Sequence, residues 1–417
     1  MSGSASKPLV WIACGGTGGH LFPGMAVADE LVIRGCDVTL LVSPKEVDQQ
    51  AIKTVHGMGV ATLPAIGLTR GRVLQFCAAF RRSHSEARKL LRERPAQAVL
   101  GMGGFTSAPP ILAAKACGAA TFLHESNTIP GRANRWLAHV VHQAFVGFPS
   151  AANRLHHTNV LATGTPVRPQ FEPSDPHSAR MALGLEPNRA VVLVMGGSQG
   201  ASGINDLVLR ALPILGRELP DAQYLHLTGA DDFERVRSAY LAQHLRAVVR
   251  PFLSEMEIAL AGATVAISRA GASSLAELAA MRVPAILVPY PTATDNHQYY
   301  NARALVDVGA AVLMDQKSAT AEKLVSLVSG LLRDEQARRT ISDELVRWHS
   351  PHAAELIAGK MLALMAAMGL CPSTGHRTHS FGAPDDRSAV NACRTGVGYT
   401  VGWKPALPQC ESAGAKT

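Results

Sequence analysis

The stretch that decides the fold runs from Ser268 to Ala302 and reads SRAGASSLAELAAMRVPAILVPYPTATDNHQYYNA. An apolar strand ending near Ile267 leads into a Gly-Ala-Ser-Ser turn, and strong helix formers follow from Leu275 to Met281. A second apolar strand, Val283 to Pro289, leads to the polar run from Asp295 to Gln298. The order strand, tight turn, helix, strand is typical of a parallel α/β sheet.

The start of this helix predicts an anion site. Its first backbone N–H groups have no partner within the helix and carry about half a positive charge, so a phosphate can bind there without a lysine. Glu277 admits two interpretations. With Ser274 it fits the S-x-x-E pattern of a capping box, and it could equally be a carboxylate that binds a ligand.

Length and composition indicate a globular protein of two domains. The chain has 417 residues, of which 47% are hydrophobic and 17% charged. It contains no apolar run of about 18 residues, and its first residues do not resemble a signal peptide, so we expect it to stay in the cytoplasm. Seven cysteines without C-x-x-C spacing argue against a disulfide framework and a zinc site. We expect four of them to be small core residues: Cys14, Cys36, Cys77 and Cys117.

The pattern of strand, glycine loop and helix occurs twice. It is seen first in the strand Leu9 to Ala13, the loop Cys14 to His20 and a helix from about Leu21 to Arg34. It returns in the strand Val191 to Met195, which precedes the loop GGSQGA and a helix from about Ser202. We therefore predict two doubly wound, Rossmann-like domains whose strand C-termini face one cleft.

The boundaries between these units follow from proline and glycine. The run GTPVRP breaks the pattern, so we place the first domain at 8–165 and the second at 166–350. A final helix is expected at about 353–368. Residues 371–417 are rich in Gly, Ser, Pro and Thr without periodicity and are predicted to be a disordered tail.

His20 closes the first glycine loop at a helix start. A helix N-terminus lowers the pKa of a histidine, which favours the neutral form that a general base needs. The alternative is a histidine that only packs in the turn. The loop itself fits neither G-x-G-x-x-G nor a P-loop, which disfavours nicotinamide binding.

Other polar segments follow predicted strands and could line the same rim. They are GMGGFTS from Gly101 to Ser107 and HESN from His124 to Asn127. In the second unit, Ser198 and the backbone amides of its loop could hold a phosphate, or the loop could be only a tight turn. Arg168 is a natural bidentate partner for a phosphate, with a solvated linker arginine as the alternative.

Positive charge is concentrated between Arg70 and Arg94, where eight Lys or Arg residues face only Glu86 and Glu93. Apolar residues of this segment, among them Phe76 and Phe80, recur at near-helical spacing. The stripe could be core, or the helix could lie on an anionic membrane surface, with Arg81 and Arg82 beside it. No motif supports binding to nucleic acid.

Taken in order, the motifs GGTGGH with FPGMAVA, GMGGF, HESN, GTPVR, GGSQGA, SRAGASSLAELA and DNHQYYNA make the chain similar to the MurG family of peptidoglycan N-acetylglucosaminyltransferases. The resemblance covers about residues 8–368. It implies a GT-B fold and the conversion of lipid I to lipid II, with inversion. The donor would be UDP-N-acetylglucosamine, held mainly by the second domain. The acceptor would be undecaprenyl-pyrophosphoryl-N-acetylmuramoyl-pentapeptide, attacking through its C4 hydroxyl at the cytoplasmic face of the cell membrane.

The resemblance also implies roles for single residues. His20 is the candidate base, Glu277 would bind the uridine ribose, Leu253 would contact uracil through its backbone, and Gln298 would select the sugar. The remaining donor contacts would be Thr17, Gly18, Gly19, Asn127, Arg168, Ser198, Gly271, Ala272 and Ser273. The acceptor side would include Gly103, Gly104, His124 and Glu125. The pattern of the basic segment itself, rather than the resemblance, gives the expected membrane contacts Phe76, Phe80, Arg81 and Arg82.

Two positions depart from the family pattern, because His297 stands where some members have a second glutamine and Thr165 replaces an asparagine. No DxD pair follows the first strands, so neither a metal nor another cofactor is required. Two other functions stay open at this point. One is a UDP-N-acetylglucosamine epimerase on the same scaffold, and the other is a scaffold protein that binds a nucleotide sugar without transferring it.

Overall fold

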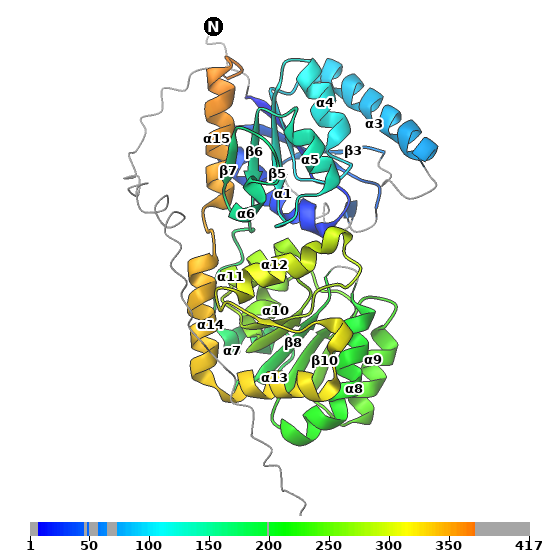
Figure 1. The fold of residues 1–417 in the computed structure, drawn as a ribbon, viewed down its shortest axis with the longest axis vertical. Coiled ribbons are helices and arrows are strands. Elements are labelled where there is room, and N and C mark those ends of the chain that lie inside the picture. The colour runs from blue at the N-terminus through cyan, green and yellow to red at the C-terminus, as the bar shows by residue number, and fades with distance from the viewer. Residues whose placement is uncertain (1–6, 46–47, 50–56, 65–72, 198–199, 372–417) are drawn as a thin grey trace, which may run out of the picture. The chain divides into compact units, whose positions relative to one another are not determined.

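The described residues form two parallel β-sheets, each with helices on both faces (Figure 1). The structure is a computed structural model that describes residues 7–45, 48–49, 57–64, 73–197 and 200–371. The predicted disordered tail therefore lies outside the described residues, apart from Cys371. So do Ser198 and the first part of the basic segment.

The first sheet has seven strands in the order β3-β2-β1-β4-β5-β6-β7, and every neighbouring pair is parallel. The strands are β1 (Leu9–Ala13), β2 (Asp37–Val42), β3 (Gly59–Thr62), β4 (Ala98–Gly101), β5 (Ala120–Glu125), β6 (Gln143–Val146) and β7 (Val160–Ala162). The helices are α1 (Gly18–Ile33), α3 (Val73–Glu93), α4 (Ala108–Ala116), α5 (Arg132–Ala138) and α6 (Pro149–Ala152).

The second sheet has six parallel strands in the order β10-β9-β8-β11-β12-β13. They are β8 (Val191–Met195), β9 (Gln223–Leu227), β10 (Ala247–Arg250), β11 (Val265–Ser268), β12 (Ala285–Leu287) and β13 (Val312–Leu313). The helices are α7 (Pro176–Ala182), α8 (Ser202–Glu218), α9 (Phe233–Ala242), α10 (Met256–Gly262), α11 (Ala272–Ala280), α12 (His297–Val306), α13 (Ala321–Arg333) and α14 (Glu335–Trp348), with short 3₁₀ turns at Thr294–Asn296 and Gln316–Ser318.

Both sheets reverse their strand order beside their first strand, as predicted for doubly wound domains. The last helix of the described residues, α15 (Ala353–Ala367), returns to the first sheet (Figure 1). Its residues Ile357, Met361 and Met365 are buried in the same apolar cluster as β1 and α1. The helix expected at 353–368 is thus confirmed, and it completes the core of the first sheet.

The starts of two helices differ from the sequence-based expectation. α1 begins at Gly18 rather than near Leu21, and α11 begins at Ala272 rather than at Leu275. Small residues in each turn enter the helix because an extended residue before them serves as the N-cap. The interpretation of Glu277 as part of a capping box is therefore wrong, because the motif requires the third helical position and Glu277 lies beyond it.

The expectation that four cysteines are core residues is half correct. Cys14 and Cys36 are buried, whereas Cys77 and Cys117 are exposed. Cys77 lies on the outer side of α3, and Cys117 follows the last turn of α4. Small apolar residues are common on helix surfaces, so residue type alone could not separate the two pairs.

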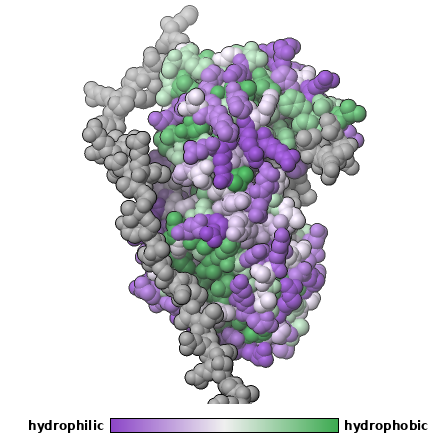
Figure 2. Space-filling model, in the orientation of Figure 1, coloured by the Kyte–Doolittle hydropathy of each residue, from purple (hydrophilic) through white to green (hydrophobic). Residues whose placement is uncertain are grey.

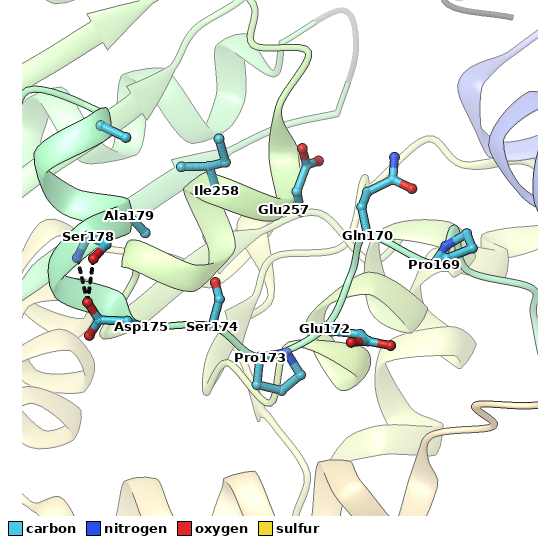
Figure 3. Close-up of a pocket in the computed structure, with 11 residues that line it drawn as sticks. Pro169, Gln170, Glu172, Pro173, Ser174, Asp175, Ser178, Ala179, Glu257 and Ile258 are labelled. Atoms are coloured by element: carbon cyan, nitrogen blue, oxygen red, sulfur yellow. Dashed lines mark hydrogen bonds between the residues drawn. The ribbon is translucent and has the colours of Figure 1, made fainter. Parts of the chain in front are cut away.

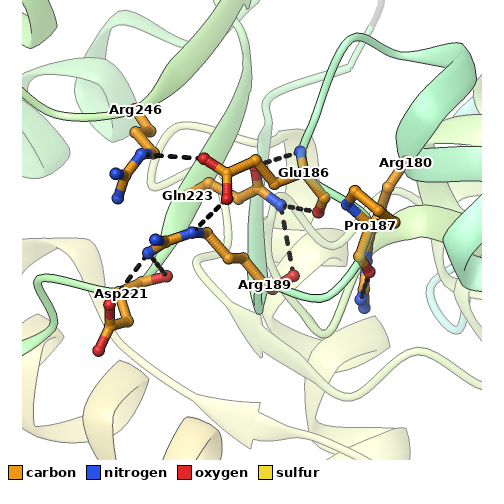
Figure 4. Close-up of polar contacts among 7 residues, drawn as sticks. All are labelled: Arg180, Glu186, Pro187, Arg189, Asp221, Gln223 and Arg246. Carbon is orange, nitrogen blue, oxygen red and sulfur yellow. Dashed lines mark hydrogen bonds and ion pairs between the residues drawn. The ribbon is translucent and has the colours of Figure 1, made fainter.

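A polar network closes the edge of the second sheet where the strands begin (Figure 4). Arg189 pairs with Glu186 at 2.5 Å and with Asp221 at 3.0 Å, and Arg246 pairs with Glu186 at 3.1 Å. The side chain of Gln223 donates to the carbonyl of Glu186 at 2.6 Å. These contacts tie the loops at the N-terminal edge together. The opposite edge, where the strands end, carries the predicted site residues.

Candidate active site

Two helices from different sheets begin beside each other. The N-cap residues Thr17 of α1 and Gly271 of α11 are both extended and make no side-chain capping bond. The Ser273 hydroxyl donates to the Gly19 carbonyl at 3.0 Å. The structure therefore brings the predicted donor residues 17–19 and 271–273 together, at a point where two positive helix ends meet.

His20 lies in the first turn of α1, against the turn of Gly103 and Gly104. Both glycines have positive φ values, +116° and +74°, and a Cβ added to Gly103 would lie 2.9 Å from His20 Cε1. The turn therefore needs glycine both for its backbone and for the space that the imidazole occupies. These two predicted acceptor-side residues form the wall against which His20 packs.

Burial keeps His20 neutral. Burial lowers the pKa of its imidazole, and the negative charge of Glu125 opposes that shift. Its Nδ1 is buried and has no hydrogen-bond partner within the described residues. The neutral imidazole is the form that a general base requires.

Glu125 organises the loop that follows β5. Its carboxylate accepts from the backbone and side-chain amides of Asn127 at 2.8 and 3.1 Å, from the Gly131 backbone at 2.9 Å and from the Asn134 side chain at 2.7 Å. Glu125 is 2% exposed. These bonds place Asn127 at the rim, while the Glu125 carboxylate faces inward.

His124 is fully buried and holds the linker. Its Nε2 lies 3.1 Å from the Gly164 carbonyl, and its Nδ1 lies 3.2 Å from the Ser126 hydroxyl. Burial lowers its pKa to about 4, so the ring is neutral at pH 7. Direct contact of His124 with an acceptor stays a prediction. In this geometry the His124 side chain joins β5 to the linker.

Asn301, on α12, connects the two halves of the site. Its Oδ1 accepts from the backbone and hydroxyl of Thr128 at 2.9 and 3.0 Å. Its Nδ2 donates to Asn127 Oδ1 at 3.0 Å and to the Ala270 carbonyl at 3.2 Å. Asn301 is fully buried, so these bonds are shielded from water. Sequence reasoning missed this residue, because its partners lie more than 30 positions away.

Arg168 lies between two aromatic rings. Its guanidinium carbon is 4.5 Å from the centre of the Phe22 ring, on α1, and 5.1 Å from that of Phe171. Its Nε is buried and makes no hydrogen bond within the described residues. The stacking fixes the guanidinium plane and leaves donors for an anion. This geometry favours a ligand-binding arginine over a solvated linker arginine.

Glu277 projects from the second turn of α11, near Arg168. Burial raises its pKa to about 7, Arg168 opposes the shift and Glu257 adds to it. A carboxyl group whose pKa is raised this far, near a helix N-terminus, is typical of a functional site. No hydrogen bond to Ser274 is found in the described part of the chain, in keeping with the failure of the capping box.

Gln298 and Leu253 complete the second half of the site. Gln298 Oε1 accepts from the Tyr290 backbone at 2.9 Å and from the Ala270 backbone at 3.4 Å. The side chain thus bridges the loops that follow β11 and β12. Leu253 is 6% exposed and follows β10, so its side chain packs inward. The sugar and uracil contacts assigned to these residues stay predictions.

Comparison with known proteins identifies the family. Residues 10–146 match the glycosyltransferase family 28 N-terminal domain, and residues 191–357 match the C-terminal domain of that family. A relative from Anaeromyxobacter dehalogenans (strain 2CP-C) is 38% identical over 362 residues, covering 85% of this chain and 92% of the relative. It is named UDP-N-acetylglucosamine--N-acetylmuramyl-(pentapeptide) pyrophosphoryl-undecaprenol N-acetylglucosamine transferase. This chain belongs to the MurG family.

A crystal structure of MurG from Acinetobacter baumannii supports the same family assignment. It matches with a TM-score of 0.65 and 26% identity, over 86% of this chain and all of that one. The protein is thus a glycosyltransferase with the GT-B fold, as predicted. A putative UDP-N-acetylglucosamine 2-epimerase from Listeria monocytogenes reaches a TM-score of 0.64 at 14% identity, which shows a shared fold alone. The epimerase alternative gains no support from it.

An open pocket of about 630 Å³ lies beside the linker (Figure 3). Gln170 and Glu257 point toward this space, and Asp175 caps α7 by accepting from the Ser178 backbone at 2.9 Å. None of the predicted donor or acceptor residues that the structure describes lines it. It borders Arg168 only through Pro169 and Gln170, so its size alone does not make it the reaction centre.

Proposed function

We propose that this chain transfers N-acetylglucosamine from UDP-N-acetylglucosamine to the C4 hydroxyl of the N-acetylmuramoyl unit of lipid I, giving lipid II. The observation that carries the proposal is the contact between the α1 and α11 starts, which puts a neutral histidine beside an anion-binding helix end. The hydroxyl oxygen bonds to the sugar's anomeric carbon as the bond to the UDP oxygen breaks. The configuration at that carbon inverts.

Residues of the second domain and the linker stabilise the departing UDP. As UDP departs, negative charge grows on its diphosphate. The backbone N–H groups at the start of α11 and the stacked guanidinium of Arg168 are fixed donors for that charge. Because they are positioned before the reaction, little reorganisation is needed as the charge develops.

A residue of the first domain removes the proton of the attacking hydroxyl. His20 is held by the Gly103–Gly104 turn and is kept neutral by burial. It accepts the proton of the attacking hydroxyl, and the resulting imidazolium is stabilised by the nearby carboxylate of Glu125. The amide of Asn127, oriented by the same carboxylate, faces the transferred sugar.

A transfer assay tests the proposal directly. Purified protein is supplied with UDP-N-acetylglucosamine, UDP-glucose or UDP-N-acetylgalactosamine and a soluble lipid I analogue, and products are followed by mass spectrometry. We expect one N-acetylhexosamine to be added only from the first donor. Epimerised donor formed without acceptor would instead support the epimerase, and UDP binding without transfer would support the scaffold function.

Glu277 predicts a pH dependence of donor binding. If its carboxylate accepts hydrogen bonds from the ribose hydroxyls, donor affinity should weaken as pH falls through about 7, where Glu277 gains a proton. Isothermal titration with UDP-N-acetylglucosamine, whose diphosphate has no ionisation in this range, measures this between pH 5.5 and 8.5. The Glu277→Gln variant should bind weakly with little pH dependence, and an unchanged slope in that variant would contradict the assignment.

We also propose that α3 docks on the cytoplasmic membrane surface through anionic lipids, so that the enzyme works as a peripheral protein. No helix within the described residues is long and apolar enough to cross a bilayer. Leu74 is 87% exposed at the start of α3, beside the exposed Arg81 and Arg82 of later turns. Hydrophobic surface is visible at the end of the domain where α3 begins (Figure 2). The rings of Phe76 and Phe105 meet edge to face, with their centres 5.3 Å apart.

The α3 surface leads to a prediction about vesicle binding. The Leu74→Asp variant should bind vesicles containing phosphatidylglycerol about tenfold more weakly, because an exposed leucine loses its insertion into lipid. Vesicle co-sedimentation measures the effect. Val346→Asp, on the exposed face of α14, is the matched control and should bind normally. Phe80 is less suitable for substitution, since it packs against the core.

A further inference from the structure

Asp48 is a fully buried carboxylate beneath the first glycine loop. Its Oδ2 accepts from the Gly16 backbone at 2.7 Å, and from the backbone and hydroxyl of Ser43 at 3.0 and 2.5 Å. One oxygen therefore joins the end of β2 to the loop that precedes α1. The proposed transfer chemistry assigns no role to this residue.

The same loop is held from two further directions. The Thr106 hydroxyl donates to the Gly15 carbonyl at 2.7 Å, and the ammonium of Lys45 donates to the Gly16 carbonyl at 2.9 Å. A Cβ on Gly15 would lie 2.4 Å from the Ser43 nitrogen, and Gly16 has a φ of +115°. The loop is thus pressed against β2 in a backbone conformation that only glycine adopts easily.

This loop determines where His20 lies. Only Thr17, Gly18 and Gly19 separate Gly16 from His20, and α1 begins within that interval. We infer that Asp48 is a positioning residue of the transfer reaction, whose carboxylate holds the glycine loop so that His20 is aligned with the acceptor hydroxyl. The inference rests on the proposed function, because it needs His20 to be the base.

Charge supplies a second link between Asp48 and His20. The charged and titratable groups around the imidazole are Glu125 after β5, Asp48 and Lys45 after β2, and the buried neutral His124. The two carboxylates raise the pKa of His20 against the effect of burial, and Lys45 lowers it. Asp48 therefore stabilises the imidazolium that forms when His20 takes the proton.

Paired variants test this inference through the pH profile of kcat/KM for the acceptor. The donor is kept saturating, so that protonation of Glu277 does not limit its binding. Turnover then requires neutral His20, and the acidic limb reports the pKa of His20. Asp48→Asn should move that limb to lower pH and reduce plateau kcat about tenfold, with the Kd for UDP unchanged. Lys45→Met should move the limb to higher pH by a smaller amount, because Lys45 is exposed and its charge is screened.

Asp37→Asn is the matched control, since Asp37 lies on β2 but pairs with Arg94 at the surface, and its pH profile should not change. If Asp48→Asn fails to fold, Ser43→Ala replaces it, because it removes the hydroxyl that donates to the Asp48 carboxylate, and it should lower plateau kcat with the Kd for UDP unchanged. An acidic limb that stays in place in Asp48→Asn, or an unchanged plateau kcat in Ser43→Ala, would overturn the inference. An active His20→Ala variant would instead show that the proposed base is wrong, which separates the two failures.

Discussion

Replacement of His20 by Ala is expected to lower kcat by about 10²–10⁴-fold, the usual contribution of a positioned general base. The Kd for UDP should change little, because the proposed diphosphate donors belong to α11 and the linker rather than to the imidazole. Steady-state kinetics with the soluble acceptor, together with calorimetric titration of UDP, measures both quantities. The loss should appear in kcat, since the proton is transferred only in the transition state.

The control for this experiment is His139→Ala, which removes an exposed imidazole just after α5. Its turnover should match that of the unmodified chain. The Gly103→Ala variant should resemble His20→Ala, because the added Cβ needs the space of His20 Cε1 and strains a backbone at φ +116°. A fully active Gly103→Ala enzyme would show that the position of His20 does not limit the reaction.

The local patterns of the sequence predicted most of the fold. The strands Leu9–Ala13 and Val191–Met195 appear with the predicted bounds, because each is a short apolar run that ends in a glycine loop. The strand expected at Val283 to Pro289 is shorter, Ala285–Leu287. Edge strands such as β13 were missed, since two residues carry no periodicity.

The residues that hold the site together were harder to predict. Asn301 and Asp48 act through partners that only the folded chain brings near, and neither belongs to a pattern that names its partner. Glu125 was predicted beside the acceptor, yet its carboxylate is used to shape the loop that carries Asn127. Sequence patterns indicate where strands end, whereas the identity of a buried hydrogen-bond partner depends on tertiary packing.

Substitution of Arg168 should produce the second large effect. The Arg168→Ala variant is expected to lose about 10²–10³-fold in kcat, because a preorganised donor for the departing diphosphate is removed. Affinity for intact donor should fall less, since negative charge grows as the bond to UDP breaks. Arg168→Lys should be intermediate: it keeps the charge but loses the flat stacking between Phe22 and Phe171.

The control is Arg217→Ala, which replaces an exposed arginine on α8 and should leave the kinetics unchanged.

Leaving groups provide a further test, because a donor whose departing diphosphate is a better leaving group needs less charge stabilisation. A fluorinated diphosphate analogue should therefore restore part of the lost turnover in Arg168→Ala, and no restoration in His20→Ala is expected. Equal restoration in both variants would mean that Arg168 does not act on the leaving group, and would return it to the role of a structural residue stacked between two rings.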